Sequence, residues 1–438
     1  MFLQAQSLYF PPTNDTGWAK LSPGGLGWDT TRIDSLYHFL SQNRTKAFLL
    51  LKDGKIVIEW YFGSFTKDSL WYWASAGKGL TAFLVGIAQQ EGYLRITDPS
   101  TQWLGPGWTS APPDKEALIT IRHQLTMTSG LEDSVPDPYC TLPACLSYKA
   151  DAGTRWAYHN APYTLLDSVI KAATGRSINA YFYQKVASKT GMRGAFLRIG
   201  YNSIFFSEAR SMARFGLLIL SKGWWDQTPI LTDTTYYNQM LRPSQALNPA
   251  YGYLWWLNGQ PYFMVPGLQM VFPGSLFPSA PADMVSALGK DDQILDVVPG
   301  EKLVVVRMGE ASYLASGPVP FTFHEQLWQH LRAIMVPAAS LAGGDQAFSI
   351  PMRGYSVSPN PFWGETVVTF ELGKPLPVRV KVLDMLGREI ATVAEGFYER
   401  GRHDLVLQGD RIASGVYLCR LTAGEWYMER LLLKIDGP

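Results

Sequence analysis

Residues 71–92 read WYWASAGKGLTAFLVGIAQQEG. From Leu80 onward the apolar residues recur at helical spacing, and Gly92 is placed to end the helix. Ser75 and Lys78 stand three residues apart where this helix begins, so both side chains should project from one face of its first turn. A lysine can activate a neighbouring serine when burial and the helix dipole lower the lysine pKa. The pattern therefore predicts a nucleophile and its base, although S-x-x-K alone is a weak signal and serine is a common helix cap.

A second group of polar residues lies in AGTRWAYHNAPY, residues 152–163. Tyr158 and Asn160 are two residues apart, so in an extended loop both can face one cleft while His159 points the other way. A phenol becomes a useful base near neutral pH when a cation such as Lys78 stabilises the phenolate. We therefore predict Tyr158 as a proton shuttle paired with Lys78 and discount a Ser-His pair. Taken alone, Y-x-N much more often describes a partly buried tyrosine beside a polar loop.

Together these residues resemble the motifs of the serine β-lactamase and penicillin-binding-protein superfamily: Ser75-x-x-Lys78, Thr128-Ser129-Gly130-Leu131 and Tyr158-x-Asn160. The resemblance is closest to the class C-like branch, which includes family VIII carboxylesterases, D-amino-acid-specific peptidases and 6-aminohexanoate-oligomer hydrolases. It covers about residues 25–335 and includes GTRWAYHN, ARSMARFGLLIL, YGYLWWLN and ALGKDDQILDVVPGEKLVVV. It implies an acyl-enzyme on Ser75, proton transfer by Lys78 and Tyr158, and an Asn160 that holds the substrate or Lys78.

The third motif of that family is altered in this chain. Relatives carry Lys-Thr-Gly, His-Thr-Gly or a variant about ten residues before a proline that ends a strand, and counting back from Pro299 gives Ala287-Leu288-Gly289. The resemblance implies that the backbone N–H groups of Ser75 and Lys290 form the oxyanion hole, which needs no side chain. The lost basic side chain weakens recognition of a substrate carboxylate, unless Lys290 or an arginine from elsewhere replaces it. This favours ester or amide hydrolysis over a β-lactamase or carboxypeptidase.

Aromatic residues make up 13% of the chain and several lie near the motifs. Most are expected in the core, but an aromatic-walled cleft would suit an apolar acyl or linear amide substrate. Of these residues, Trp156 and Trp255 are the preferred candidates for substrate contact.

Three cysteines are present. Cys140 and Cys145 form C-x4-C with no second pair or nearby histidine, so a local disulfide is favoured over a zinc site, with two buried thiols as the alternative. A disulfide would imply an oxidising compartment. Cys419 is expected to be a buried free thiol. The sequence calls for no metal and no organic cofactor.

The order of predicted elements indicates an α+β fold in two domains. Strand-like runs at 47–62 and 284–309 flank a long helical and looped region, so one antiparallel sheet should be closed by both ends of a domain spanning 1–335. The small, weakly patterned residues 336–349 are typical of a linker. Residues 350–438 contain alternating segments separated by Gly, Asp and Pro, which predicts a small Ig-like β-sandwich. These segments are ETVVTFEL, VRVKVLDM, HDLVLQG, GVYLCRLT and MERLLLKI.

Three short stretches of residues 350–438 resemble the C-terminal sorting domain of the type IX secretion system. The resemblance implies export across the outer membrane of a Bacteroidetes-like bacterium, followed by release or surface attachment, with the secretion machinery as partner. An accessory Ig-like module without a targeting role is the alternative. The stretches are Ser358-Pro359-Asn360-Pro361-Phe362, Asp384-Met385-Leu386-Gly387-Arg388 and Ser414-Gly415-Val416-Tyr417.

Charge and hydropathy exclude some classes of protein. A formal net charge of +1 gives no electrostatic case for binding nucleic acid or an acidic membrane surface. No apolar run approaches the length of a bilayer span, so a soluble chain is expected. The start, MFLQAQS, lacks the features of an intact signal peptide. We therefore expect a secreted serine hydrolase that acts on a small-molecule or oligomeric ester or amide, with a non-catalytic surface binding module as the alternative.

Overall fold

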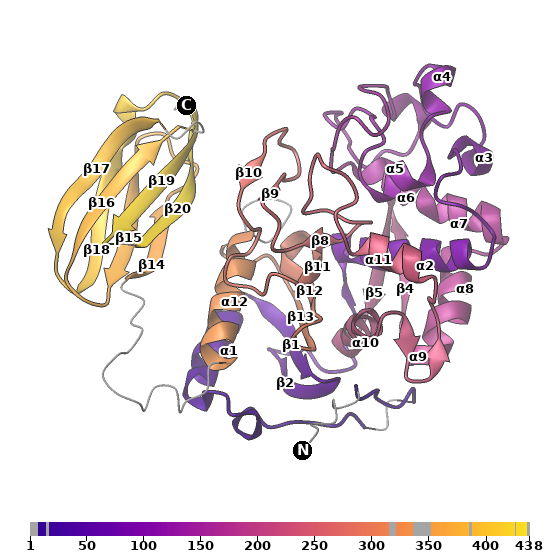
Figure 1. Cartoon of the computed structure of the whole chain (residues 1–438), viewed down its shortest axis with the longest axis horizontal. Helices are drawn as coiled ribbons and strands as arrows, with labels where there is room; N and C mark the ends of the chain where they lie inside the picture. The colour runs from indigo at the N-terminus through magenta and orange to yellow at the C-terminus, as the bar shows by residue number, and fades with distance from the viewer. Residues whose placement is uncertain are drawn as a thin grey trace. The chain divides into compact units, whose positions relative to one another are not determined.

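The computed structural model describes residues 8–14, 17–314, 321–335, 352–384, 388–424 and 426–435. The chain divides into two compact units, residues 1–338 and 339–438 (Figure 1). The predicted linker at 336–349 lies outside the described residues, as do Met385, Leu386 and Gly387 of one stretch that resembles a sorting domain.

One antiparallel sheet organises the first unit. Its strand order is β2-β1-β13-β12-β11-β8, so the hairpin near the N-terminus pairs with the strand that comes last in the unit, as predicted. The hairpin turns at Asp53 and Gly54, whose φ angles of 51° and 82° suit the Asp-Gly pair expected there. The strands are β1 (Thr45–Lys52), β2 (Lys55–Tyr61), β8 (Trp256–Leu257), β11 (Val285–Gly289), β12 (Gln293–Val298) and β13 (Leu303–Gly309).

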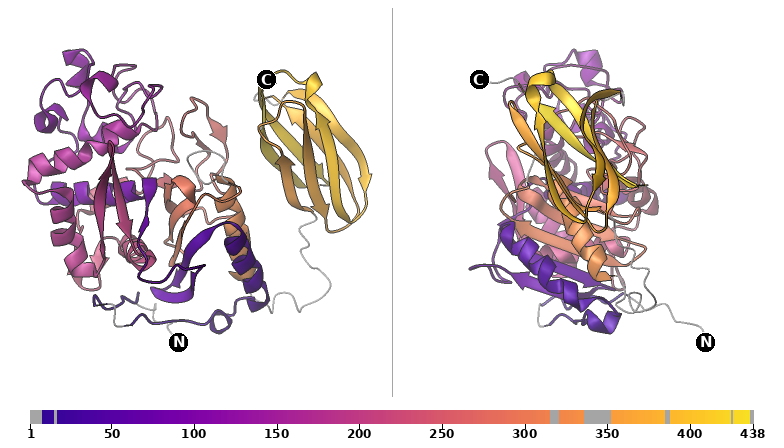
Figure 2. Two further views of the ribbon diagram at one scale, coloured as in Figure 1. Left: turned by 180° about the vertical axis from the view of Figure 1, so that it is seen from behind. Right: turned by 90° about the vertical axis from the view of Figure 1, so that its left-hand side faces the viewer.

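Helices cover both faces of this sheet. Helix α10 (Ala209–Leu220) packs on one face, and α1 (Ile33–Gln42) and α12 (Phe321–Met335) lie side by side on the other (Figures 1 and 2). A Cβ at Gly216 of α10 would meet Leu295 of β12 and Val304 of β13. The next residue of β12, Asp296, is hydrogen-bonded to His324 of α12. Alternate residues of one strand thus face opposite helices, which is why β12 and β13 are buried along their whole length.

The helical region carries the nucleophile segment and a small second sheet. The 3₁₀ turn η3 (Ala74–Ala76) leads directly into α2 (Gly77–Gln90), which ends just before Gly92 as predicted. The second sheet has the order β3-β5-β4. Its strands are β3 (Trp71–Tyr72), β4 (Gly194–Ile199) and β5 (Asn202–Ser207), and the nearby helices are α5 (Ile121–Leu125), α6 (Asn160–Thr164) and α7 (Leu166–Thr174).

Gly130 lies five residues beyond the end of the helix that precedes it. Helix α5 stops at Leu125, and Met127 takes the left-handed conformation with φ of 58°. Gly130 has φ of 76°, and a Cβ there would lie 2.1 Å from the carbonyl oxygen of Ala150. The glycine therefore allows two loops to approach each other and does not cap the helix.

The other elements of this unit are short. They are η1 (Gly24–Leu26), η2 (Thr30–Arg32), α3 (Thr101–Leu104), α4 (Pro113–Glu116), η4 (Pro143–Cys145), α8 (Ile178–Phe182), η5 (Tyr183–Ala187), α9 (Ser188–Thr190), β6 (Trp224–Trp225), β7 (Thr228–Pro229), α11 (Thr234–Met240), β9 (Tyr262–Phe263), β10 (Phe272–Pro273) and η6 (Lys290–Asp292). In the part of the chain that the structure describes, no helix combines the length and apolar character needed to cross a bilayer.

The second unit consists of two antiparallel sheets over one core. One sheet has the order β14-β15-β18 and the other β17-β16-β19-β20. Buried side chains from both sheets, including Phe370, Val380 and Cys419, form a single cluster, and Cys419 is a free thiol as expected. The sequence missed β14 and also β17, whose residues are mostly exposed and show no clean alternation. The strands are β14 (Met352–Ser358), β15 (Glu365–Leu372), β16 (Leu376–Leu383), β17 (Glu389–Tyr398), β18 (Gly401–Gln408), β19 (Gly415–Ala423) and β20 (Trp426–Lys434), with the turn η8 (Gly409–Arg411) between β18 and β19.

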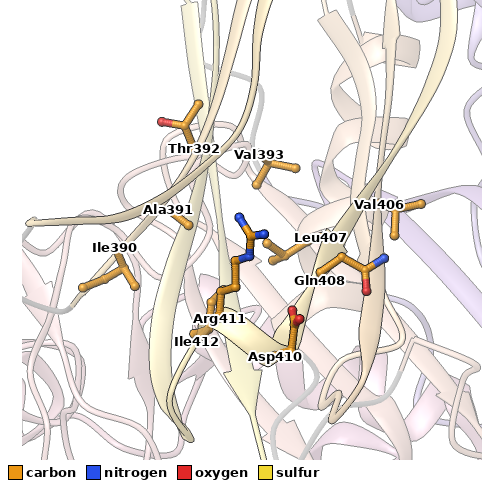
Figure 3. A pocket seen from close by; sticks show the side chains of 10 residues that line it. All are labelled: Ile390, Ala391, Thr392, Val393, Val406, Leu407, Gln408, Asp410, Arg411 and Ile412. Atoms are coloured by element: carbon orange, nitrogen blue, oxygen red, sulfur yellow. The ribbon is translucent and has the colours of Figure 1, made fainter.

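A cavity of about 570 Å³ opens between β17 and β18 in this unit (Figure 3). It is lined mainly by aliphatic side chains such as Val393 and Leu407, and the Arg411 side chain extends into it. None of the residues predicted to be catalytic lies along it.

Candidate active site

The nucleophile candidate Ser75 lies in a tightly held turn between β3 and α2. Ala74 has φ of 47°, a left-handed conformation that is uncommon for a residue other than glycine. Trp73, two residues before Ser75, is fully buried, and its indole Nε1 donates to Ser207 Oγ at 2.7 Å. The sheet β3-β5-β4 therefore anchors the turn from one side and fixes where the Ser75 hydroxyl points.

Lys78 lies in the first turn of α2 and joins the two predicted motifs. Its Nζ is 2.8 Å from Ser75 Oγ and 2.8 Å from Asn160 Oδ1. The lysine is only 2% exposed, and Nζ lies 5.0 Å from the ring centre of Tyr158 and 4.0 Å from that of Tyr163. The structure thus brings Ser75, Lys78, Tyr158 and Asn160 into one cluster.

This environment favours the neutral form of Lys78. Burial lowers the pKa of Lys78 well below its ordinary value, because desolvation penalises the ammonium form. Its two hydrogen-bonding partners are a hydroxyl and an amide, and neither carries a negative charge. A neutral amine has a lone pair that can accept the Ser75 proton, which is the property required of a general base.

Tyr158 is held in its protonated form by the same surroundings. Burial raises the pKa of Tyr158 above its ordinary value, and a hydrogen bond with Ser75 only partly opposes this effect. Its ring stacks on Trp256, with ring centres 5.9 Å apart and planes 17° from parallel. The sequence predicted a phenolate stabilised by a Lys78 cation, but burial penalises both charges, so the neutral pair is favoured.

His159 faces away from this cluster, as the alternation of side chains predicted. It is 2% exposed, and the charged groups that influence it are Asp133, Arg155 and Glu132. Burial lowers the pKa of His159 to about 4. Its ring is therefore neutral at physiological pH and takes no part in a Ser-His pair.

The altered third motif lies directly beside the nucleophile turn. A Cβ at Gly289, the last residue of β11, would be 2.4 Å from the Trp73 carbonyl oxygen and 3.1 Å from the Ala76 nitrogen. Gly289 therefore permits β11 to approach the backbone on both sides of Ser75. Lys290 follows with an exposed side chain, whereas Ala287 is buried in the sheet.

The tryptophans proposed for substrate contact lie in the core. Trp255 is fully buried, and its ring occupies the space where a Cβ at Gly79 of α2 would stand. Trp156 is 1% exposed and packs against Trp256. Trp156 nevertheless lies beside Tyr158, with ring centres 6.4 Å apart, as do Tyr251 and Trp256, and Tyr163 contacts Lys78. Tyr163 lies three residues after Asn160 on α6, so helical spacing from Asn160 would have indicated it.

The predicted disulfide between Cys140 and Cys145 is present, with an S–S distance of 2.07 Å. It closes a small loop next to Tyr139, which lies near enough to Tyr158 to influence its pKa. Across the described parts of both units, no group of three or more His, Cys, Asp and Glu side chains is arranged to hold a metal ion.

Comparison with known proteins identifies the family. A sequence profile described as Beta-lactamase matches residues 41–315, well over half of the chain. The chain belongs to the beta-lactamase family. The matched residues include the whole cluster around Lys78 and end soon after β13.

Relatives within the beta-lactamase family include hydrolases of esters and amides. The 6-aminohexanoate-dimer hydrolase of Paenarthrobacter ureafaciens is 22% identical over 224 residues, which cover 44% of this chain and 56% of that protein. A family VIII carboxylesterase has a similar structure, with a TM-score of 0.53, 15% identity, and coverage of 69% of this chain and 97% of its own. The octameric penicillin-binding protein homologue of Pyrococcus abyssi gives a TM-score of 0.51 at 15% identity, covering 93% of this chain and 96% of its own. The chain thus has the beta-lactamase-like α+β fold and spans a little over half the length of the 6-aminohexanoate-dimer hydrolase.

Proposed function

We propose that this protein is a serine hydrolase that cleaves carboxylic esters or linear amides through an acyl-enzyme on Ser75. The observation that carries the proposal is the 2.8 Å separation between Ser75 Oγ and Nζ of Lys78, whose pKa burial lowers. A buried lysine in contact with a serine hydroxyl and an amide oxygen contributes little to stability, because its desolvation is not repaid by an ion pair. A lysine in this environment is suited to accept a proton during catalysis.

In the acylation step, Ser75 Oγ bonds to the substrate carbonyl carbon while its proton passes to Lys78 Nζ. The backbone N–H groups of Ser75 and Lys290 stabilise the oxyanion that forms on the carbonyl oxygen. As the oxyanion collapses, the bond from the carbonyl carbon to the leaving oxygen or nitrogen breaks. Tyr158 gives that atom its phenolic proton and regains a proton from the Lys78 ammonium. Asn160, 2.8 Å from Lys78 Nζ, keeps the amine directed at the nucleophile.

In the deacylation step, water attacks the acyl carbon and gives up a proton to the same pair. Ser75 Oγ is released from the acyl group and regains its proton. The products are a carboxylic acid and an alcohol or amine.

The substrate class is proposed from the altered third motif together with the named relatives. Ala287 provides no charge to pair with a substrate carboxylate, which favours a neutral acyl group. A simple carboxylic ester fits this expectation. A linear aminohexanoate oligomer carries a terminal ammonium and a terminal carboxylate and is kept as a candidate because a hydrolase of its dimer, like a carboxylesterase, occurs among the relatives. β-Lactam or D-amino-acid peptide hydrolysis is the alternative.

The test is hydrolysis of a panel consisting of short p-nitrophenyl esters, a linear aminohexanoate dimer and nitrocefin. Wild type should turn over an ester or the amide, nitrocefin turnover should be slow or absent, and Ser75→Ala should abolish activity. Ser64→Ala, at an exposed position, is the matched control and should keep the wild-type rate. Full activity in Ser75→Ala would disprove the acyl-enzyme.

A non-catalytic binding module is the second candidate. A fluorophosphonate probe forms a covalent bond only with an activated serine, so labelling of wild type but not of Ser75→Ala would exclude that candidate. An unlabelled wild type would favour it.

We also propose that residues 350–438 act as a type IX sorting domain and that the enzyme is secreted or attached to the cell surface. The Cys140–Cys145 disulfide fits an oxidising compartment. Expression of the full chain and of residues 1–335 in a Bacteroidetes host with this secretion system would test the idea. Export of the shorter chain at an equal level would refute it.

A further inference from the structure

The backbone just after Gly289 adopts an unusual conformation. Lys290 begins the turn η6, in which Asp291 and Asp292 have φ angles of 61° and 57°. Two successive residues other than glycine in the left-handed region cost conformational energy, so neighbouring contacts must hold them there.

Arg307 supplies the main set of these contacts from β13. Its side chain is fully buried, and Nη1 donates to the carbonyl oxygens of Asp291 at 2.8 Å and Asp292 at 3.0 Å. Nη2 donates to the carbonyl oxygens of Asn43 at 2.8 Å and Glu310 at 2.9 Å. A rigid planar donor group thus ties the turn to the end of the central sheet.

Gln293 adds a second anchor. Its Nε2 donates to the carbonyl oxygens of Asp291 at 2.9 Å and Gly309 at 2.6 Å, and its Oε1 accepts from the Gly309 N–H at 3.1 Å. With Arg307, this directs the carbonyl groups of the turn toward the sheet. The backbone just after Lys290 is therefore held from the interior.

Tyr72 connects the same turn to the nucleophile. Its hydroxyl donates to Asp291 Oδ2 at 2.6 Å, and Tyr72 lies in β3, three residues before Ser75. Burial and this hydrogen bond both raise the pKa of Tyr72, so the phenol keeps its proton at physiological pH. One hydrogen bond thus spans the two backbone segments that carry the Ser75 and Lys290 N–H groups.

We propose that Tyr72, Asp291 and Arg307 are positioning residues that set the distance between the two donors of the oxyanion hole. Arg307 fixes the shape of the Lys290 turn, and the Tyr72–Asp291 hydrogen bond holds that turn in register with Ser75. The inference rests on the proposed acyl-enzyme function. It assigns these residues an effect on the transition state, where the oxyanion is charged, and little effect on binding of the neutral substrate.

The test variant is Tyr72→Phe, which removes only the hydroxyl. Its matched control is Tyr61→Phe, because Tyr61 donates to the Glu59 carboxylate at 2.8 Å on β2, the far edge strand of the central sheet. The readouts are kcat and KM for a p-nitrophenyl ester, and the inhibition constant of a trifluoromethyl ketone that forms a tetrahedral oxyanion on the serine. For Tyr72→Phe we expect kcat and ketone affinity to fall together by about tenfold or more, with KM within about twofold. Tyr61→Phe should match wild type.

Two results would overturn the inference. Unchanged kcat and ketone affinity in Tyr72→Phe would show that the hydrogen bond does not position the donors. A raised KM with unchanged kcat would assign Tyr72 to substrate contact instead. If Tyr72→Phe does not fold, Asp291→Ala removes the acceptor of the same bond and carries the same expectations. Absence of fluorophosphonate labelling in wild type would refute the proposed function rather than this inference.

Discussion

Replacing Gly289 with alanine should move apart the backbone N–H groups of Ser75 and Lys290, the two proposed donors of the oxyanion hole. Gly289 has φ of −130° and ψ of 159°, an extended conformation that alanine adopts freely, so the substitution introduces no backbone strain. The difficulty is space, because the new Cβ would stand 2.4 Å from the Trp73 carbonyl oxygen, where real contacts exceed 3.0 Å. The end of β11 or the nucleophile turn must therefore move by about 0.6 Å or more.

That displacement sets the magnitude of the expected effect. Misplacement of reacting groups by about 1 Å costs roughly a hundredfold in rate. We therefore expect kcat/KM for a p-nitrophenyl ester to fall about 30- to 100-fold, equivalent to about 2 to 2.7 kcal/mol of transition-state stabilisation. The free energy of unfolding should fall by about 1 to 3 kcal/mol, as for other overpacked sites.

The matched control is Gly216→Ala on α10. Its Cβ would stand 2.4 Å from Val304 Cγ1 and 2.8 Å from Leu295 Cδ1, in the core between α10 and the sheet. It should lower stability to a similar degree and leave kcat/KM near wild type at a temperature where both variants are folded. A Gly289→Ala enzyme within about threefold of wild-type kcat/KM would refute the argument that β11 must approach Ser75 this closely.

Three further predictions concern stability. Lys78→Met should abolish acylation and stabilise the fold at neutral pH. In the unfolded chain Lys78 carries a proton that the buried amine lacks. Between the lowered pKa of Lys78 and its ordinary value of 10.5, the wild type's free energy of unfolding should therefore rise by about 1.4 kcal/mol per pH unit relative to that of Lys78→Met. Urea unfolding at several pH values measures this difference. Removing the disulfide with Cys140→Ser and Cys145→Ser should lower the free energy of unfolding, measured by thermal unfolding, by about 2 kcal/mol. A reductant should destabilise only the wild type. Asp296→Ala should lower the free energy of unfolding by about 3 to 5 kcal/mol, because the side chains of Ser286, His324 and Trp328 lose their buried acceptor. The protein that still folds should keep its hydrolytic activity.

The features that the sequence predicted correctly depend on local spacing. Ser75 and Lys78 are one helical turn apart, and the alternation around His159 concerns adjacent residues, so the geometry follows from backbone periodicity alone. The pairing of β1 with β13 was also accessible, because apolar strand patterns at both ends of the unit must share one core.

The features that the sequence missed depend on contacts between distant segments. The Tyr72–Asp291 hydrogen bond joins residues 219 positions apart, and the bond from Arg307 to Asn43 joins residues 264 positions apart. Neither carries a local pattern, since a buried arginine and a tyrosine in a short strand have many possible partners. The sequence also does not distinguish Trp255 from Trp256, which are both buried: Trp255 packs on Gly79 of α2, whereas Trp256 stacks on Tyr158. Adjacent residues at a strand end point to opposite sides, so the fold decides which of the two rings meets a catalytic side chain.

The chemistry of the site follows from the way these distant contacts enclose Lys78. A lysine with a carboxylate beside it would remain an ammonium and hold its proton, and an exposed lysine would do the same at neutral pH. Here the amine meets a hydroxyl, an amide oxygen and the face of Tyr163, none of which compensates fully for a buried positive charge. Because the same burial keeps Tyr158 protonated, the resting site contains one base and one acid in contact with the same serine. The division of roles between Lys78 and Tyr158 is therefore set by desolvation before any substrate binds.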